Sequence, residues 1–163
     1  MITALQLRER LQYDPNTGRW VWLKTPRLGF VGKPAGSIDA KGYWCIKIDG
    51  QSYKASRLAY LYMTGEWPIE EMDHIDGKPW NDTWSNLRQA TRLENIQNRQ
   101  MRTDNISGAI GVYWSKGNSK WIAQIDQTYL GSFDSFEEAV AARDQAAKEL
   151  HGNFAVLNKG THR

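Results

Sequence analysis

Cysteine is almost missing from this chain of 163 residues, because Cys45 is its single example. One thiol excludes a disulfide within the chain and a zinc cluster built on several cysteines. Long apolar runs are missing as well, so no segment is expected to span a membrane. The first residues lack the apolar core of a signal peptide, which favours a reducing intracellular compartment.

A strong charge of either sign is also missing, since the net charge is only +3 and the isoelectric point is about 9.0. This is a mild bias toward polyanions such as nucleic acids. The excess lies in residues 1–100, with 14 Lys and Arg against 11 Asp and Glu, whereas residues 101–163 carry seven of each. Aromatic residues, in contrast, are plentiful, with eight Trp and seven Tyr. Most should build the core, and a few could stack on bases.

The first 70 residues are predicted to be rich in β-structure. The expected elements are a short helix within 2–12, a strand over 19–23, mostly loop over 24–42, a hairpin of 43–48 with 51–55, and a helix over 56–63. Asp49-Gly50 suits the tight turn of that hairpin, because both residues tolerate positive φ angles. Gly65 is expected to end the second helix.

The C-terminal part is predicted to be a small sheet that packs on one helix. Three short strands are expected over 111–115, 120–125 and 128–133. Ser135 and Glu138 form a capping box that begins a helix running to about Leu150. A three-stranded sheet needs such a cover on one face, which leaves the other face for a ligand. Polar residues 100–107 are predicted to be a linker, and the chain as a whole is α+β.

Residues 72–99 bring together the side chains suited to phosphodiester hydrolysis. The pattern predicts a strand at Asp73-His74, a loop, a second strand over 86–90 and a helix from Thr91. A neutral histidine can take a proton from water near pH 7, and one carboxylate with one amide oxygen can hold a hydrated divalent cation. His74, Asp73, Asn86 and Asn95 supply these groups.

Spacing alone leaves a plainer interpretation open. Asp73, Asp76 and Asn81 could be turn-forming residues, with His74 on the edge of a strand. Neighbouring residues in a strand point to opposite faces, so Asp73 and His74 need a twist or a bulge to meet one phosphate.

Residues 56–99 resemble the HNH nucleases of phage and intron homing endonucleases. The resemblance rests on residues 57–68 (RLAYLYMTGEWP), then Asp73-His74-Ile75-Asp76-Gly77, Asn86-Leu87-Arg88 and Glu94-Asn95. It implies a nuclease domain over 1–99, with a ββα-metal core over about 70–99. It also implies His74 as general base, Asn86 as the residue that orients it, and Asp73 with Asn95 as ligands of one Mg²⁺ or Mn²⁺ ion.

Residues 107–158 resemble a second family, the plant ethylene-response-factor domain of the apetala-two type. The resemblance implies a domain over 108–160 whose sheet lies in the DNA major groove. The implied contact positions and their neighbours are Tyr113, Ser115, Lys116, Lys120, Gln124, Gln127 and Tyr129. Several positions that are usually Arg in that family are Tyr, Ser or Gln here, so the strength of sequence reading is open.

Basic residues offer further DNA contacts, although a solvated surface would look the same. Four of them follow the catalytic strand, namely Arg88, Arg92, Arg99 and Arg102, and four others lie in the N-terminal part, namely Lys41, Lys47, Lys54 and Arg57.

The sequence thus predicts a site-specific endonuclease of the homing type that acts on double-stranded DNA. One centre per chain suits nicking by a monomer or double-strand cutting by a homodimer. A DNA-binding regulator with an inactive centre, and a repair or restriction nuclease, remain alternatives. The expected location is the bacterial cytoplasm or the host nucleoid, for a phage-encoded protein.

Overall fold

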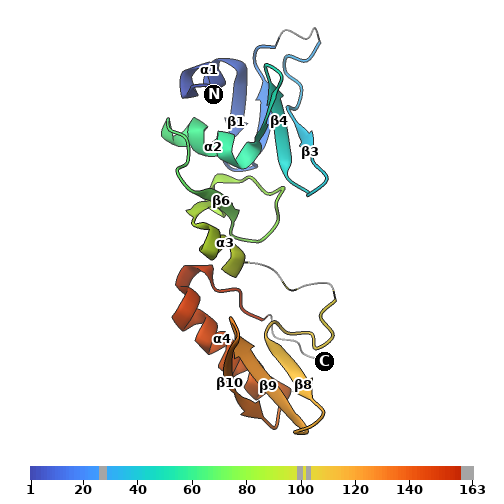
Figure 1. Cartoon of the computed structure of the whole chain (residues 1–163). Helices are drawn as coiled ribbons and strands as arrows, with labels where there is room; N and C mark the ends of the chain where they lie inside the picture. Colours follow the sequence, from blue (N-terminus) through green and yellow to red (C-terminus); the bar gives the residue numbers. More distant parts are fainter. Residues whose placement is uncertain (26–28, 99–100, 102–103, 159–163) are drawn as a thin grey trace. The chain divides into compact units, whose positions relative to one another are not determined.

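The computed structural model describes residues 1–25, 29–98, 101 and 104–158. It has the predicted α+β class and divides into two compact units, Met1–Arg92 and Leu93–Arg163 (Figure 1). The division falls earlier than residue 99, where the nuclease domain was expected to end, and the predicted domain bounds stay predictions. Within the described residues, none of the helices has both the length and the apolar character needed to cross a bilayer.

The first unit is a series of small sheets with two helices. Its elements are α1 (Ala4–Arg10), β1 (Leu11–Asp14), β2 (Arg19–Trp22), β3 (Ser37–Ile38), β4 (Trp44–Ile48), β5 (Gln51–Lys54), α2 (Ala55–Thr64), β6 (Glu71–His74), the 3-10 turn η1 (Trp84–Asn86) and β7 (Leu87–Ala90). The antiparallel sheets are β1-β2, β3-β4-β5 and β6-β7. The helix α3 (Arg92–Gln97) follows β7 directly and crosses the division between the units.

Local signals account for most of these boundaries. Thr3 and Gln6 form a capping box at the start of α1, which is shorter than expected because Leu11 already pairs with Trp22 in β1-β2. The β4-β5 turn uses Asp49 and Gly50 at φ 49° and 83°, as predicted. The two-residue strand β3 lies within residues that were expected to be loop, and it pairs with β4 through Ser37–Cys45 and Ile38–Trp44.

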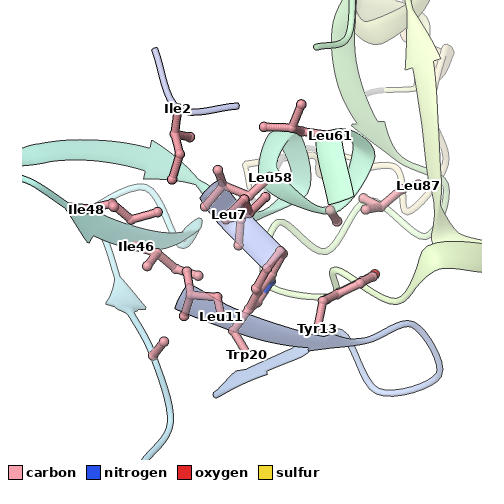
Figure 2. Packing of buried hydrophobic residues seen from close by; sticks show 13 residues of the cluster. Ile2, Leu7, Leu11, Tyr13, Trp20, Ile46, Ile48, Leu58, Leu61 and Leu87 are labelled. Atoms are coloured by element: carbon pink, nitrogen blue, oxygen red, sulfur yellow. The ribbon is translucent and has the colours of Figure 1, made fainter. Parts of the chain in front are cut away.

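One apolar core holds the first unit together. Figure 2 shows side chains from α1, α2 and the strands converging on it, and the fully buried large ones are Trp20, Leu7, Leu11, Ile46, Leu58 and Leu61. Tyr13 lies against Trp20 with ring centroids 4.7 Å apart, and Tyr62 meets both rings edge-on. The surplus of aromatic residues thus serves the core, as expected.

The second unit has the predicted sheet and helix. It contains β8 (Val112–Ser115), β9 (Lys120–Ile125) and β10 (Thr128–Phe133) in the order β10-β9-β8, then α4 (Phe136–His151) and the 3-10 turn η2 (Gly152–Phe154). The Ser135–Glu138 capping box begins α4, and Gly152 follows its last residue. Its core is built from small residues, Ala109, Val112, Ala123 and Ala139, with larger side chains packed around them.

Candidate active site and DNA-facing sheet

The hairpin β6-β7 carries Asp73 and His74. Asp73 lies opposite Arg88 and His74 lies opposite Leu87, in a register that is regular along β6. The bulge considered above is therefore absent from this pairing, so a twist at the end of β6 would have to bring the two side chains to one phosphate. Both are nevertheless buried, with 4% and 5% of their surface exposed. Buried ionisable groups at a strand end argue against the plainer interpretation of a surface edge.

His74 is held by a carboxylate that the sequence analysis did not single out. Its Nε2 lies 2.9 Å from Oδ1 of Asp82, and the two side chains are only 5% and 3% exposed. Burial raises the pKa of Asp82, while the hydrogen bond and the charge of His74 oppose that rise. A hydrogen bond of this kind fixes the orientation of an imidazole ring.

The loop between β6 and η1 is organised by amide side chains. Asn86 Nδ2 donates to Asp76 Oδ1 at 3.0 Å and to the carbonyl of Asn81 at 2.8 Å, and its Oδ1 accepts from the Asp76 amide. In the described part of the chain, the Asn86 side chain makes no hydrogen bond to His74. Its predicted role in orienting that ring stays a prediction, and its observed contacts shape the loop.

Asp76 is the acceptor at the centre of this loop. Burial raises the pKa of its carboxyl, but hydrogen bonds from the Asn81 side chain, the Lys78 amide and the Asn86 side chain outweigh burial, so the pKa is lowered overall. The charged carboxylate thus fastens the loop that carries Asp82.

Asp73, the predicted metal ligand, is paired with a predicted DNA contact. Arg88 Nε lies 2.7 Å from Asp73 Oδ2, and the guanidinium is mostly buried. The cross-strand position makes this ion pair a consequence of the β6-β7 register. Arg88 can therefore balance the charge of the Asp73 carboxylate as well as approach a phosphate.

The N-terminal sheet brings two more side chains toward His74. The ring centroids of Tyr43 and His74 lie 6.1 Å apart. Lys54 Nζ lies over the Tyr43 ring, 3.5 Å from its centroid. Asp39 fixes the turn before Tyr43, because its Oδ1 accepts from the amides of Lys41 and Tyr43. A lysine on an aromatic face near a buried histidine is well placed for a polyanion.

The other predicted basic contacts differ in what they bind. Arg57 donates to the carbonyls of Pro68 and Glu70 and lies over Trp67, so it serves the fold. Arg92 begins α3 and is exposed. The predicted contacts Arg99 and Arg102 lie outside the described residues.

The donor types suit a hard divalent cation. Asp73 and Asn95 offer a carboxylate and an amide oxygen, which are ligands that Mg²⁺ and Mn²⁺ accept together with water. Asn95 is half-buried on α3. No group of three or more His, Cys, Asp or Glu side chains gathers among the described residues, and such a group is what a closed zinc site would need.

The sheet of the second unit gathers on one face five of the seven DNA contacts predicted for residues 113–129. Tyr113 lies opposite Ile122, Gln124 lies opposite Tyr129, and alternation along β9 places Ile122 and Gln124 together. The same face carries Tyr113, Ser115, Lys120, Gln124 and Tyr129, while Lys116 and Gln127 lie in the adjoining turns and are exposed.

Two details of this face were not expected. Ile122, which alternates with Ala123 and so shares a face with Gln124, is buried. Lys120 forms an ion pair with Asp134 at 2.7 Å, which reduces the positive charge that the face presents.

Comparisons with known proteins identify the family. A model described as HNH endonuclease matches residues 53–97, the segment that holds α2, β6, β7 and α3. Protein 3.8 of Escherichia phage T7 is 37% identical over 114 residues, which cover 64% of this chain and 93% of that protein. The chain belongs to the HNH endonuclease family. This membership implies hydrolysis of DNA phosphodiester bonds.

Two further relatives share less. The ethylene-responsive transcription factor WRI1 of Arabidopsis thaliana is 23% identical over 155 residues, and the match covers 87% of this chain but 35% of that protein. The structure described as DNA binding and cleavage by the HNH homing endonuclease I-HmuI is 27% identical with a TM-score of 0.43, covering 55% of this chain and 51% of that chain. This chain thus spans about a third of the first protein and half of the second.

Asp82 is the main site residue that the sequence analysis missed. It stands in a loop rich in Pro, Asn and Asp, where aspartate is an ordinary turn residue. The β1-β2 hairpin contacts this loop through Tyr13 and Gly18, and that contact has no signature in the local sequence.

Proposed function

We propose that this protein is a site-specific, divalent-metal-dependent DNA endonuclease in which His74 is the general base. The observation that carries the proposal is the buried His74–Asp82 pair at the end of β6, within the segment that matches the HNH family. A histidine whose Nε2 proton is donated to a carboxylate keeps its basic lone pair on Nδ1. That nitrogen would accept the proton of the attacking water.

The remaining polar residues have supporting roles in this proposal. Asp73 and Asn95 would hold one Mg²⁺ or Mn²⁺ ion, which when bound supplies positive charge for the phosphate and the leaving oxygen. Asn86 keeps the loop of Asp76 and Asn81 in shape beside the base. Arg88 neutralises Asp73 and lies where a backbone phosphate would approach the hairpin.

The sheet face of the second unit would choose the site. Glutamine can read adenine through paired hydrogen bonds, so Gln124 is the residue expected to contact a base. Tyr113 and Tyr129 flank it as exposed aromatic rings. Lys116 and Lys120 would contact phosphates, together with Arg92, Arg99 and Arg102. An apetala-two-like domain over 108–160 is part of this proposal.

Plasmid nicking tests the catalytic part. The wild type should convert supercoiled DNA to the open circle with Mg²⁺ or Mn²⁺, and His74→Ala should lower the rate by about 10²–10⁴-fold, the usual contribution of a general base. A wild type that shifts DNA on a gel yet leaves the plasmid intact with every divalent metal would contradict the proposal and favour a DNA-binding regulator.

The site-choice part needs a separate readout. Gln124→Ala should leave the rate of nicking on non-specific plasmid within about twofold while it flattens the preference among cleavage sites mapped by sequencing, since one base contact is worth about 1–3 kcal/mol of discrimination. An unchanged site pattern would remove Gln124 from base reading.

A further inference from the structure

The loop that carries Asp82 is fastened to the N-terminal hairpin β1-β2. The Tyr13 hydroxyl donates to the main-chain carbonyl of Asp82 at 2.6 Å, in a buried position. Two residues further on, the Trp84 amide donates to the carbonyl of Pro15 at 2.8 Å. Two hydrogen bonds thus join the β1-β2 hairpin to a loop far along the sequence.

A close backbone approach adds a third point of contact. Gly18 has φ +70°, and a Cβ atom there would lie 2.6 Å from the carbonyl carbon of Asp82 and 2.7 Å from the amide nitrogen of Thr83. Only glycine allows the hairpin turn to press this closely on the loop. The peptide bond between Asp82 and Thr83 therefore has little room to move.

We propose that Asp82 is the positioning residue of His74, and that the hairpin β1-β2 belongs to the catalytic apparatus because Tyr13 holds Asp82 in place. The proposal rests on the proposed function of His74 as general base. It extends that function beyond the segment 53–97 that matches the family, since Tyr13, Pro15 and Gly18 all lie outside it.

The physical argument is one of orientation. Asp82 Oδ1 accepts from Nε2, which selects the Nε2–H tautomer and fixes the plane of the His74 ring. Both groups are buried, so the hydrogen bond is strong and water does not compete with it. Tyr13 in turn lies between Trp20 and Tyr62 in the core, so its hydroxyl is a rigid anchor.

Two substitutions of equal shape separate orientation from packing. Asp82→Asn keeps an oxygen that can accept from Nε2, whereas Asp82→Leu has the same branched outline without an acceptor. Under single-turnover conditions, with enzyme in excess over plasmid and saturating Mg²⁺, we expect Asp82→Leu to nick about 100-fold more slowly and Asp82→Asn less than about 10-fold more slowly. The fraction of plasmid cleaved at the end of the reaction and the affinity for DNA should stay within about twofold of the wild type for both variants.

A smaller substitution tests the hairpin without touching the pair. Tyr13→Phe removes only the hydroxyl and should slow nicking about fivefold, the effect of losing one ordinary hydrogen bond. Tyr62→Phe is the matched control, because it removes a hydroxyl from the same aromatic cluster that makes no hydrogen bond to Asp82. Its nicking rate should equal that of the wild type.

The ring itself gives a readout that does not depend on activity. The chain has three histidines, so the ¹⁵N-labelled full-length protein, free of DNA and metal, should give three imidazole patterns, with His74 assigned by His74→Gln. We expect the wild type to show His74 as the Nε2–H tautomer with a slowly exchanging proton, Asp82→Asn to keep that pattern, and Asp82→Leu to lose it.

The outcomes are distinct. If Asp82→Leu nicks like the wild type, or keeps the Nε2–H pattern, Asp82 does not position His74. If Tyr13→Phe and Tyr62→Phe slow nicking equally, the hairpin acts only through general stability. If no variant and no wild type nicks DNA, the proposed function fails, and the NMR pattern alone decides whether Asp82 orients the ring.

Discussion

Each unit of this protein contains one histidine paired with an aspartate, and the two pairs differ in burial. His74 and Asp82 are 5% and 3% exposed, whereas His151 is 4% exposed and its partner Asp126 is 64% exposed. The Asp126 carboxylate, 2.6 Å from His151, reaches in from a turn and ties the β9-β10 hairpin to the end of α4. A histidine–aspartate hydrogen bond thus belongs to a candidate reaction centre in one unit and connects two structural elements in the other.

The cores differ in the same sense. The first unit packs large side chains such as Trp20 and Tyr13 around α2, and this rigid core extends to the loop beside His74. The second unit packs alanines, which let α4 lie close to its sheet. Precise placement of a reacting group requires a rigid core of large side chains, as in the first unit. Presenting a sheet face to DNA requires only that the sheet stay packed on its helix.

The largest expected effect separates the two histidines. His74→Gln should lower the single-turnover nicking rate by about 10²–10⁴-fold, because the general base is lost. His151→Gln should leave that rate within about twofold and modestly lower the thermal stability of the second unit, since an ordinary hydrogen bond contributes about 0.5–1.5 kcal/mol. If both variants lost nicking to the same extent, the conclusion that only the His74–Asp82 pair serves the reaction would be wrong.

The next effect concerns the aromatic core. Trp20→Ala should lower the free energy of unfolding of the first unit by about 3–5 kcal/mol, because a fully buried indole leaves a cavity. Hydrogen exchange followed by mass spectrometry reports each unit through its own peptides. We expect faster exchange in α1 and α2 and unchanged exchange in α4; a uniform change across the chain would show that the units unfold together.

The converse change tests the alanine core. Ala139 is fully buried where α4 meets the sheet, so Ala139→Leu should cost about 1–3 kcal/mol by overpacking. Ala141→Leu, at an exposed position of the same helix, is the control. Peptides of β9 and α4 should exchange faster in Ala139→Leu alone. If this variant is as stable as the wild type, the contact between α4 and the sheet is looser than the burial of Ala139 indicates.

The smallest effect is acid sensitivity of the first unit. Hydrogen bonds from the Thr17 side chain and the Asn16 amide lower the pKa of Asp14, and the Tyr43 amide lowers that of Asp39. A carboxyl with a lowered folded pKa stabilises the fold above its unfolded pKa, and this contribution is lost as the pH falls through the folded value. The urea concentration at the midpoint of unfolding should therefore decrease as the pH is lowered below about 4.

Asparagine variants isolate these two carboxyls. Asp14→Asn and Asp39→Asn keep acceptor oxygens in both turns but cannot titrate, so their urea midpoints should depend less on pH between about 2.5 and 4.5 than the wild type does. An identical pH dependence in all three proteins would assign the acid sensitivity to other groups.

How far the sequence predicts this molecule depends on the range of each interaction. The Asp49-Gly50 turn, the Ser135–Glu138 capping box and the three strands of the second unit were predicted correctly, because their signals lie within a few residues. The strand β3 is only two residues long and lies among glycines, which hid it although its partner β4 is close in the sequence. Asp82 is contacted by Tyr13, a partner far along the chain, and local patterns carry no trace of that contact. Tertiary contacts decide such positions.

The candidate site divides in the same way. His74 and Asp73 were placed correctly on a strand that pairs with residues 87–90. The partner of each was not foreseen: Arg88, which was predicted to contact DNA, pairs with Asp73, and His74 pairs with Asp82 from the predicted loop. Their catalytic and metal-binding roles remain predictions for the experiments above.

The contact between the first hairpin and the Asp82 loop also limits how this nuclease could be transplanted into other proteins. A fragment cut at residue 53, where the family match begins, would keep α2 but lose the side chains that cover it, such as Leu7, Leu11 and Trp20. Its apolar face would then attract other chains, and the loop beside His74 would lose its anchor. The portable part is the N-terminal unit together with α3, and fusion partners should be joined outside it.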